Sequence, residues 1–395
     1  MWTGPVQVTV LMPEAEIIAE IMKKNGKKHA IIPIFIPHLG CPYDCVFCNQ
    51  REITARTAAP DTRQVDATIK QWLTTLQDAE VEIAFYGGSF TGIPMEMQSA
   101  YLDVAKKYKD RGIVTKLHLS TRPDFIDEEI LENLRAHGVD VIELGAQSFD
   151  DRVLALSNRG HTADDTRRAS RLIRSYGFQL GIQLMIGLPG DSRESCVMSA
   201  REAVKLEPEL ARLYPTIVLD DTRLYQMYRE GLYTPLTREE AVATTADMYR
   251  ILDDAGIRIM RVGLKSTDII GDGGAINGGT YHPAFRQLVE GRIAREKIEP
   301  MLEKASSQAE ARAADAGDGS AGEERGANIR RDRTLKVDVF SSPAWFSNMI
   351  GNSGENRKRF SEEFPRLNIR YRSDPDIRDG EFRVVVKEDP AEDPA

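Results

Sequence analysis

Three of the four cysteines of this 395-residue chain, Cys41, Cys45 and Cys48, fall within eight positions. Their C-x3-C-x2-C spacing is typical of thiolate ligands to a 4Fe–4S cluster or to zinc. A cluster has four irons, so three thiolates would leave one iron open to a small chelating molecule. Zinc would need a fourth ligand, which His38 could supply. Clustered cysteines in a cytosolic chain favour metal binding or catalysis over disulfides. We expect the distant Cys196 to be a buried core residue on a helix.

A pair of glycines, Gly87 and Gly88, forms a second candidate site within the segment 85–92. Glycines at the end of a strand let the backbone approach a ligand closely. The pair is also compatible with a plain turn. It gains significance because it would lie on the same side of the same sheet as the cysteines.

Short apolar segments and amphipathic segments alternate for more than 200 residues and position these motifs. We expect strands over residues 31–36, 81–86, 115–120, 139–145, 179–186, 213–219 and 257–262. We expect helices over residues 62–76, 95–107, 128–137, 162–176, 192–206 and 238–255, followed by a helical segment over 281–302. Repeated strand–helix units predict an α/β fold with a parallel sheet, in the form of a partial or complete (β/α) TIM-type barrel, whose functional sites lie on the loops after the strands.

The composition divides the chain into further parts. Residues 1–28 form an N-terminal extension and residues 29–302 form the barrel with its helical extension. Residues 303–333 contain almost no large apolar side chain, which predicts a disordered linker. Residues 334–387 predict a small α+β domain, and residues 388–395 an acidic tail.

The small domain contains a Gly-x-x-Gly sequence, from Gly351 to Gly354, between two expected helices. The order strand, helix, GxxG, helix, strand, strand resembles a KH domain, in which this loop contacts a nucleic-acid backbone. Arg357 and Lys358 follow the loop and would contribute to RNA binding. The alternative is a helix–turn–helix connection in which glycine merely ends the first helix.

Several motifs together resemble the radical SAM superfamily, whose members use S-adenosylmethionine (SAM). They are the cysteine loop with Phe47, the glycine pair, and the segments 120–124, 142–148, 158–162, 187–190 and 213–216. In their order these segments resemble the catalytic radical SAM subunit of the Elongator complex, which acts on the wobble uridine of tRNA. The chain departs from that family at Asn49 and Gln50, and we recognise no acetyltransferase-like segment after the barrel. Modification that starts from acetyl-CoA is therefore not carried over.

The resemblance implies two cofactors, a 4Fe–4S cluster and SAM, and a reductant such as ferredoxin or flavodoxin. Reductive cleavage of SAM would yield a 5′-deoxyadenosyl radical. The implied cluster ligands are the three clustered cysteines. The implied SAM-binding residues are Gly87, Gly88, Ser89, Ser120, Gln147, Ile186 and Gly187. Arg122 and Asp124, and likewise His161, are expected in turn or helix-cap roles, and no catalytic residue is assigned.

The net charge of −9 and the lack of a long apolar run or signal-peptide pattern predict a cytoplasmic protein without a membrane partner. We therefore expect a radical SAM enzyme that acts on RNA, with a tRNA-like substrate. Two alternatives remain open at this point. One is a radical SAM reaction on a small molecule such as a tetrapyrrole, and the other is a non-catalytic iron–sulfur RNA-binding protein.

Overall fold

We describe a computed structural model of the chain, covering residues 28–36, 41, 44–48, 59–76, 79–264, 276–315 and 335–387. The chain divides into two units. The first comprises residues 1–237 and 248–281, and the second comprises residues 238–247 and 282–395. No helix among the described residues is long and apolar enough to cross a membrane.

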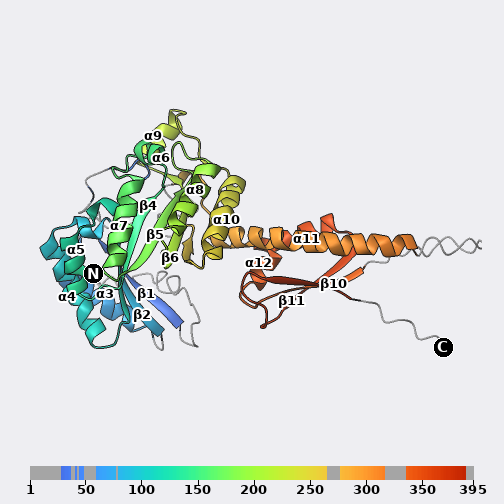
Figure 1. The fold of residues 1–395 in the computed structure, drawn as a ribbon, viewed down its shortest axis with the longest axis horizontal. Coiled ribbons are helices and arrows are strands. Elements are labelled where there is room, and N and C mark those ends of the chain that lie inside the picture. Colours follow the sequence, from blue (N-terminus) through green and yellow to red (C-terminus); the bar gives the residue numbers. More distant parts are fainter. Residues whose placement is uncertain are drawn as a thin grey trace, which may run out of the picture. The chain divides into compact units, whose positions relative to one another are not determined.

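The first unit is built on a seven-stranded parallel sheet in the order β1-β2-β3-β4-β5-β6-β8 (Figure 1). Its strands are β1 (Lys28–Ile36), β2 (Ala79–Gly87), β3 (Lys116–Thr121), β4 (Val141–Gln147), β5 (Gln179–Ile186), β6 (Leu210–Pro215) and β8 (Arg258–Val262). The ladder runs from β1 to β8 without pairing these two strands, so the sheet is a partial barrel rather than a closed one. A small antiparallel pair, β7 (Ile217–Leu219) and β9 (Ile276–Gly279), lies in the same unit.

Helices connect successive strands, which is what parallel pairing requires. They are α3 (Thr62–Leu73), α4 (Met95–Asp110), α5 (Glu128–Ala136), α6 (Asp151–Leu156), α7 (Ala163–Ser175), α8 (Arg193–Val204), α9 (Arg223–Arg229) and α10 (Arg238–Asp254). Local sequence fixes several starts. Asp61 and Gln64 form a capping box at α3, and Thr162 and Asp165 form one at α7.

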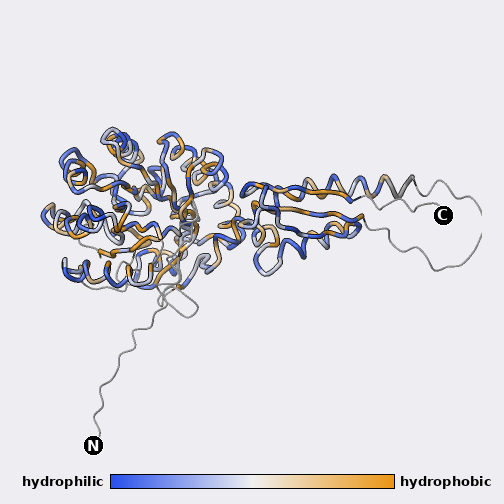
Figure 2. The backbone as a smooth tube through the Cα atoms, turned by 90° about the horizontal axis from the view of Figure 1, so that it is seen from below, coloured by the Kyte–Doolittle hydropathy of each residue, from blue (hydrophilic) through white to orange (hydrophobic). Residues whose placement is uncertain are grey.

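Alternation along each strand separates two sides of the sheet. On β2 the buried Ile83 and Phe85 belong to one side, where Phe85 contacts Phe90 and Tyr101 of the helical layer. Glu82 and Tyr86 point to the other side, which is the concave interior of the half-barrel. Figure 2 shows the hydrophobic residues running along the strands.

The second unit packs α11 (Phe285–Asp315), α12 (Phe346–Ile350) and α13 (Glu355–Glu363) against a three-stranded sheet. Its strands are β10 (Leu335–Ser341), β11 (Leu367–Ser373) and β12 (Phe382–Val386). The central β10 pairs parallel with β11 and antiparallel with β12. The core gathers Ile298 and Leu302 of α11 with Val337 and Val339 of the sheet.

Most expected elements are confirmed to within a few residues, and two expectations are corrected. Residues 303–315 belong to α11 rather than to a disordered linker, because Ala305 and Ala309 continue the buried stripe of Leu302. The rest of that segment, and the extension 1–27 and tail 388–395, lie outside the described residues. The single strand expected over 213–219 divides into β6 and β7 at Thr216, and α6 and α9 were not predicted.

Candidate functional site

The loops that carry the predicted motifs meet at one edge of the large sheet. Parallel strands end at the same edge, and the cysteine loop follows β1, the glycine pair ends β2, and Gln147 ends β4. The cysteine loop is fixed there by backbone hydrogen bonds. Val46 N–H donates to Ser157 O at 3.1 Å, and Leu224 N–H donates to Val46 O at 2.7 Å.

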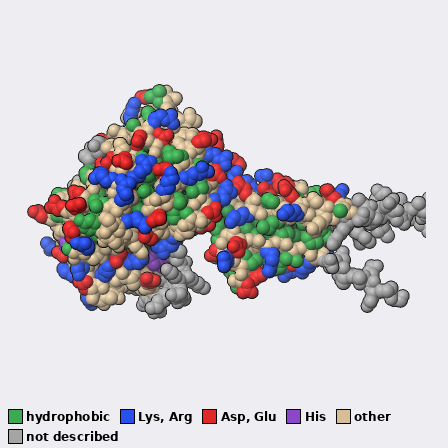
Figure 3. All heavy atoms as spheres, viewed as in Figure 1, with side chains coloured by type: hydrophobic (Ala, Val, Ile, Leu, Met, Phe, Trp, Pro, Cys, Tyr) green, Lys and Arg blue, Asp and Glu red, His purple; other side chains and the backbone are tan. Residues whose placement is uncertain are grey.

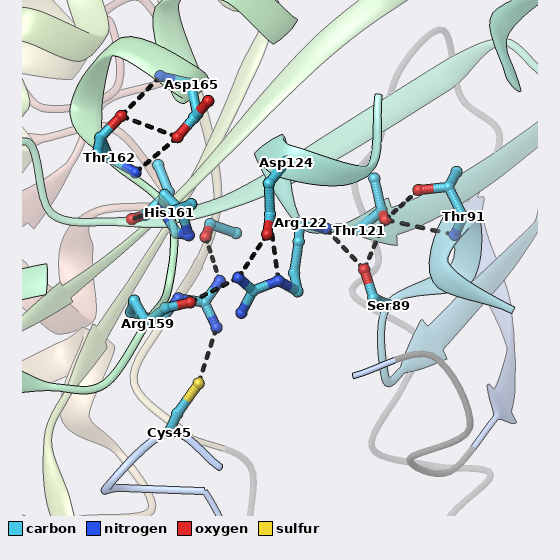
Figure 4. Close-up of polar contacts among 12 residues, drawn as sticks. Cys45, Ser89, Thr91, Thr121, Arg122, Asp124, Arg159, His161, Thr162 and Asp165 are labelled. Carbon is cyan, nitrogen blue, oxygen red and sulfur yellow. Dashed lines mark hydrogen bonds and ion pairs between the residues drawn. The ribbon is translucent and has the colours of Figure 1, made fainter. Parts of the chain in front are cut away.

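Arg159 is the cation beside the cysteines (Figure 4). Its Nη1 donates to Cys45 Sγ at 3.3 Å and its Nη2 donates to Gly145 O at 2.6 Å. The side chain is buried, and among the described residues its Nε has no hydrogen-bond partner. Burial raises the pKa of the Cys41 thiol, whereas the nearby Arg122 and Arg159 oppose the rise. Buried cations beside thiols fit a site that holds thiolates and further negative charge.

Arg122 stands at the N-cap position of the short helical turn Pro123–Phe125, as expected, but its buried side chain caps nothing and instead pairs with the half-buried Asp124. The Arg122 guanidinium donates to both oxygens of Asp124, at 2.9 and 2.8 Å, and also to Arg159 O at 2.5 Å. The expected cap role of His161 is wrong, because Thr162 is the N-cap of α7. Burial, together with the charges of Arg159 and Arg122, lowers the pKa of His161 to about 4, so its imidazole is neutral at pH 7.

The glycine pair has a structural reason that the sequence did not reveal. Gly87 adopts φ = 112°, and a Cβ there would lie 2.5 Å from Ile36 O. Gly88 N–H donates to that same carbonyl at 2.9 Å, so the turn is closed onto the end of β1. Ser89 is buried and its hydroxyl lies 2.8 Å from Thr121 Oγ1 while accepting from Arg122 N–H at 3.0 Å. The side chain of Ser89 therefore supports the loop, and any contact with SAM would use its backbone.

The remaining predicted SAM-binding residues lie at the same edge. Ser120 is half-buried on β3, and Gln147 is buried with φ = 65° where the β4–β5 register shifts. Ile186 O accepts from Thr216 N–H, and Gly187 exchanges hydrogen bonds with Asp191 and Tyr233. These backbone N–H and C=O groups already have hydrogen-bond partners, so a contact with SAM would be an additional one. The SAM-binding roles of Ile186 and Gly187 stay predictions.

A charged network occupies the interior of the half-barrel. Arg212 Nε donates to Glu143 Oε2 at 2.7 Å, and its Nη2 donates to Tyr86 Oη at 2.5 Å. His118 Nε2 lies 3.6 Å from the same carboxylate, and Glu82 pairs with His29 at 2.9 Å. Burial alone would raise the pKa of Glu143, but Arg212 and His118 hold it at about 2. These charges are nearly enclosed and matched.

The donor set of three thiolates fits an iron–sulfur cluster. Among the described residues, no three His, Cys, Asp or Glu side chains gather closely enough to hold one metal ion. A cluster spreads its thiolates over different irons, so it does not need that convergence. Cys196 is buried and donates to Asp191 Oδ2 at 3.0 Å, which excludes it as a fourth thiolate. His38, the alternative zinc ligand, lies outside the described residues.

The GxxG segment of the second unit forms a tight turn. Gly351 has φ = 82°, and a Cβ there would lie 2.7 Å from Asn356 N. Gly354 has φ = 78° but faces only the flexible end of Arg357. Asn352 Nδ2 donates to Gln287 Oε1 of α11 at 2.9 Å. The glycines are thus required by the fold of this turn, and RNA binding by the loop stays a prediction.

Sequence reasoning missed Arg159 as the partner of Cys45. The segment 158–162 contributes to the resemblance to the radical SAM superfamily, but the sequence assigns no chemical role to its arginine. Spacing gave no signal, since Arg159 lies far along the chain from Cys45. A buried arginine directly after a positive-φ residue, Asn158 (φ = 51°), is recognised only once the fold brings the two loops together.

Comparisons with known proteins agree with this geometry. A model of the radical SAM superfamily matches residues 35–203, and one of the radical SAM C-terminal domain matches residues 208–295. The uncharacterized protein MJ0486 of Methanocaldococcus jannaschii is 30% identical over 239 residues, which cover 58% of this chain and 73% of that protein.

Two further relatives carry a function in their names. A tRNA uridine(34) acetyltransferase of Dehalococcoides mccartyi is 27% identical over 266 residues, covering 58% of each chain. This chain therefore spans less than two thirds of that relative. The solved structure of archaeal Methanocaldococcus infernus Elp3 with an N-terminal deletion aligns with a TM-score of 0.56 and 23% identity, covering 68% of this chain and 63% of that one. It shows the shared fold.

A cysteine triplet and a glycine turn at one edge of a parallel half-barrel, matched by both family models over most of residues 35–295, establish the family. The chain is a member of the radical SAM superfamily, an enzyme family that uses a 4Fe–4S cluster and SAM.

Proposed function

We propose that this enzyme modifies RNA, with a tRNA-like substrate, by radical chemistry started at Cys41, Cys45 and Cys48. The observation that carries the proposal is the meeting of the cysteine loop, the glycine turn and Arg159 at one edge of the sheet. The RNA part is supported by the relative that is named a tRNA uridine(34) acetyltransferase.

The three cysteines would hold the cluster, and Gly87, Gly88 and the Ser89 backbone would lie nearest the amino group of SAM. When bound, the cluster would supply the electron for cleavage of SAM to methionine and a 5′-deoxyadenosyl radical, and a reductant such as ferredoxin or flavodoxin would provide that electron. The chain provides positioning. Arg159 places an N–H on Cys45 Sγ, and its own orientation is fixed by Gly145 O.

We infer that the reacting part of the substrate enters the interior of the half-barrel from the edge that carries the cysteine loop. Ser120, Gln183 and Tyr214 are half-buried at positions that alternate with buried residues facing the helices. Below them, Glu143 and Arg212 already satisfy each other. We infer that Ser120, Gln183 and Tyr214 contact the substrate, whereas the Glu143–Arg212 ion pair closes the interior beneath it.

Anaerobic reconstitution with iron and sulfide, followed by dithionite and SAM, tests the chemistry. Wild-type enzyme should bind about four irons per chain and release 5′-deoxyadenosine. Cys48→Ser should lose both properties, whereas Cys196→Ser, the matched control, should retain them. Iron-free protein that holds zinc on the thiolates would contradict the cluster assignment.

Nucleoside mass profiling of tRNA incubated with the reconstituted enzyme tests the substrate. The expected result is a new nucleoside mass that depends on SAM and on Cys48. A product that forms on a tetrapyrrole but not on tRNA would contradict the RNA assignment. Tight tRNA binding without 5′-deoxyadenosine would instead indicate a non-catalytic RNA-binding protein.

A further inference from the structure

The three-stranded sheet of the second unit has one covered and one uncovered face. Side chains of one parity pack on α11, α12 and α13, among them Val337 and Val339 of β10 and Val384 of β12. No described element packs on the side chains of the other parity. We call this second surface the outer face. Its nine positions form three rows across the strands, Asn368–Lys336–Lys387, Arg370–Asp338–Val385 and Arg372–Phe340–Arg383.

The outer face carries an excess of positive charge. Its five cations are Lys336, Arg370, Arg372, Arg383 and Lys387, and all five are exposed. At these nine described positions Asp338 is the one carboxylate, and Asp374 at the end of β11 lies beside Arg383 at 2.6 Å. Among these described residues, five cations stand against two carboxylates, in a chain whose net charge is −9.

Two of the cations share one carboxylate. Asp338 Oδ2 is shared by Arg372, at 2.8 Å, and Lys387, at 3.0 Å. Burial acts to raise the pKa of Asp338, but these cations hold it below its usual range, so it remains charged. Arg370 lies opposite Asp338 in the strand register, but the ion pairs of that carboxylate are with Arg372 and Lys387.

The face also contains apolar surface among its charges. Val385 is 39% exposed, and the Arg383 guanidinium lies 4.9 Å above the ring of Phe340. A planar guanidinium fixed on an aromatic ring offers a flat, cationic surface on which a base can stack. Basic side chains interleaved with stacking groups on an open sheet are suited to a nucleic-acid strand.

The first unit shows how an ordinary solvated charged surface differs. Helix α7 is also rich in arginine, and three of its four arginines, Arg167, Arg168 and Arg174, are paired with Glu202, Asp165 and Glu207. Figure 3 shows Lys and Arg beside Asp and Glu over much of the visible face of that unit. Balanced pairs of this kind do not indicate a polyanionic partner.

We propose that the outer face of the β11-β10-β12 sheet binds the sugar–phosphate backbone of the RNA substrate. The inference rests on the proposed function, since it concerns how that substrate is held. It differs from the GxxG prediction, because Arg357 and Lys358 belong to α13 on the covered side of the sheet. The two routes therefore use different cations and can be separated.

Two double variants with the same change of net charge test the proposal on the full chain. Lys336→Gln/Arg370→Gln removes cations of the outer face while leaving the partners of Asp338 in place. Arg357→Gln/Lys358→Gln removes the cations beside the GxxG turn. Fluorescence anisotropy with labelled bulk tRNA, measured from low to high salt, gives the affinity and the slope of its salt dependence.

The outer-face variant should bind tRNA more weakly and lower the magnitude of the salt slope by about 1.4 to 1.8, as expected for two lost phosphate contacts. The α13 variant should leave both quantities near wild-type values. Equal effects of the two variants, or an effect of the α13 variant alone, would overturn the proposal. So would equally tight binding of a heparin fragment of matched charge.

Residues 388–395 are the other candidate occupant, because they follow Lys387 and contain four carboxylates. If they cover the face, the outer-face variant of the full chain binds tRNA like wild type, and only a chain that ends at Lys387 responds to the substitutions. That outcome would overturn RNA as the occupant. Formation of 5′-deoxyadenosine, measured separately, keeps a failure of this proposal distinct from a failure of the proposed function.

Discussion

The large sheet and the small sheet both carry charged residues on one side. In the large sheet these residues are buried and paired, whereas in the small sheet most of them are exposed. In the half-barrel, Glu143 and Arg212 are 1% and 8% exposed and satisfy each other. On the outer face of the small sheet, Arg370 and Arg372 are exposed, and the cations at the described positions of that face outnumber the carboxylates.

The difference follows from the dielectric environment. A buried charge without a partner costs several kcal/mol, so the interior of the half-barrel tolerates only matched sets. Water stabilises an exposed cation, so folding does not require the outer face to be neutral. An unmatched surface excess is therefore free to serve a partner, whereas a buried matched set serves the fold.

Replacement of Arg212 gives the largest expected effect. Arg212→Leu leaves the buried Glu143 without its guanidinium, and we expect the free energy of unfolding to fall by about 3–5 kcal/mol. Arg370→Leu on the outer face is the matched control and should change it by about 0.5 kcal/mol or less. Urea unfolding followed by circular dichroism measures both. Similar losses for the two variants would break the comparison.

The glycine turns of the two units extend the comparison from charge to steric packing. Gly87→Ala places a Cβ against Ile36 O, so backbone strain of about 1–2 kcal/mol adds to an overpacking cost of about 1–3 kcal/mol. Gly354→Ala meets only the end of Arg357 and should cost the strain alone. Thermal unfolding of the two variants gives the order, and a larger loss for Gly354→Ala would contradict it.

Acidification should lower the free energy of unfolding by protonating Glu143 of the buried Glu143–Arg212 pair. The folded-state pKa of Glu143 is about 2, below its ordinary value of 4.5. The stability that this depressed pKa contributes is present above pH 4.5 and is lost as the pH falls from 4.5 toward 2. The difference in unfolding free energy between wild type and Glu143→Gln, measured from pH 7 to pH 3, should narrow toward the acid end. A constant difference would show that Glu143 does not titrate in this window.

Asp338→Asn should affect stability much less than Arg212→Leu. The carboxylate is 2% exposed, but the side chains of Arg372 and Lys387 that pair with it are about half exposed and can turn to water, so we expect a loss of about 1 kcal/mol. The variant should also bind tRNA more tightly, because the outer face loses a negative charge. A loss of unfolding free energy as large as that of Arg212→Leu would show that charged side chains contribute equally to stability in the two sheets.

Much of the fold could be predicted, because apolar periodicity and glycine breaks act locally. The expected strand over residues 179–186 agrees with β5 at both ends. The helical continuation to Asp315 was missed, because the small alanines that bury α11 resemble the composition of a linker. The turn that divides β6 from β7 was missed because both strands are apolar and only one residue separates them.

The sequence by itself determined the three thiols, the glycine turn and the order of strands and helices, since each depends on residue type and short-range spacing. The tertiary structure decided which distant residues meet them. It placed Arg159 on Cys45, closed Gly87 onto Ile36, matched Glu143 with Arg212, and left the cations of the outer face without equal numbers of acids. These contacts join strands and loops far apart in the chain, so only the register of the sheets and the packing of their helices could fix them.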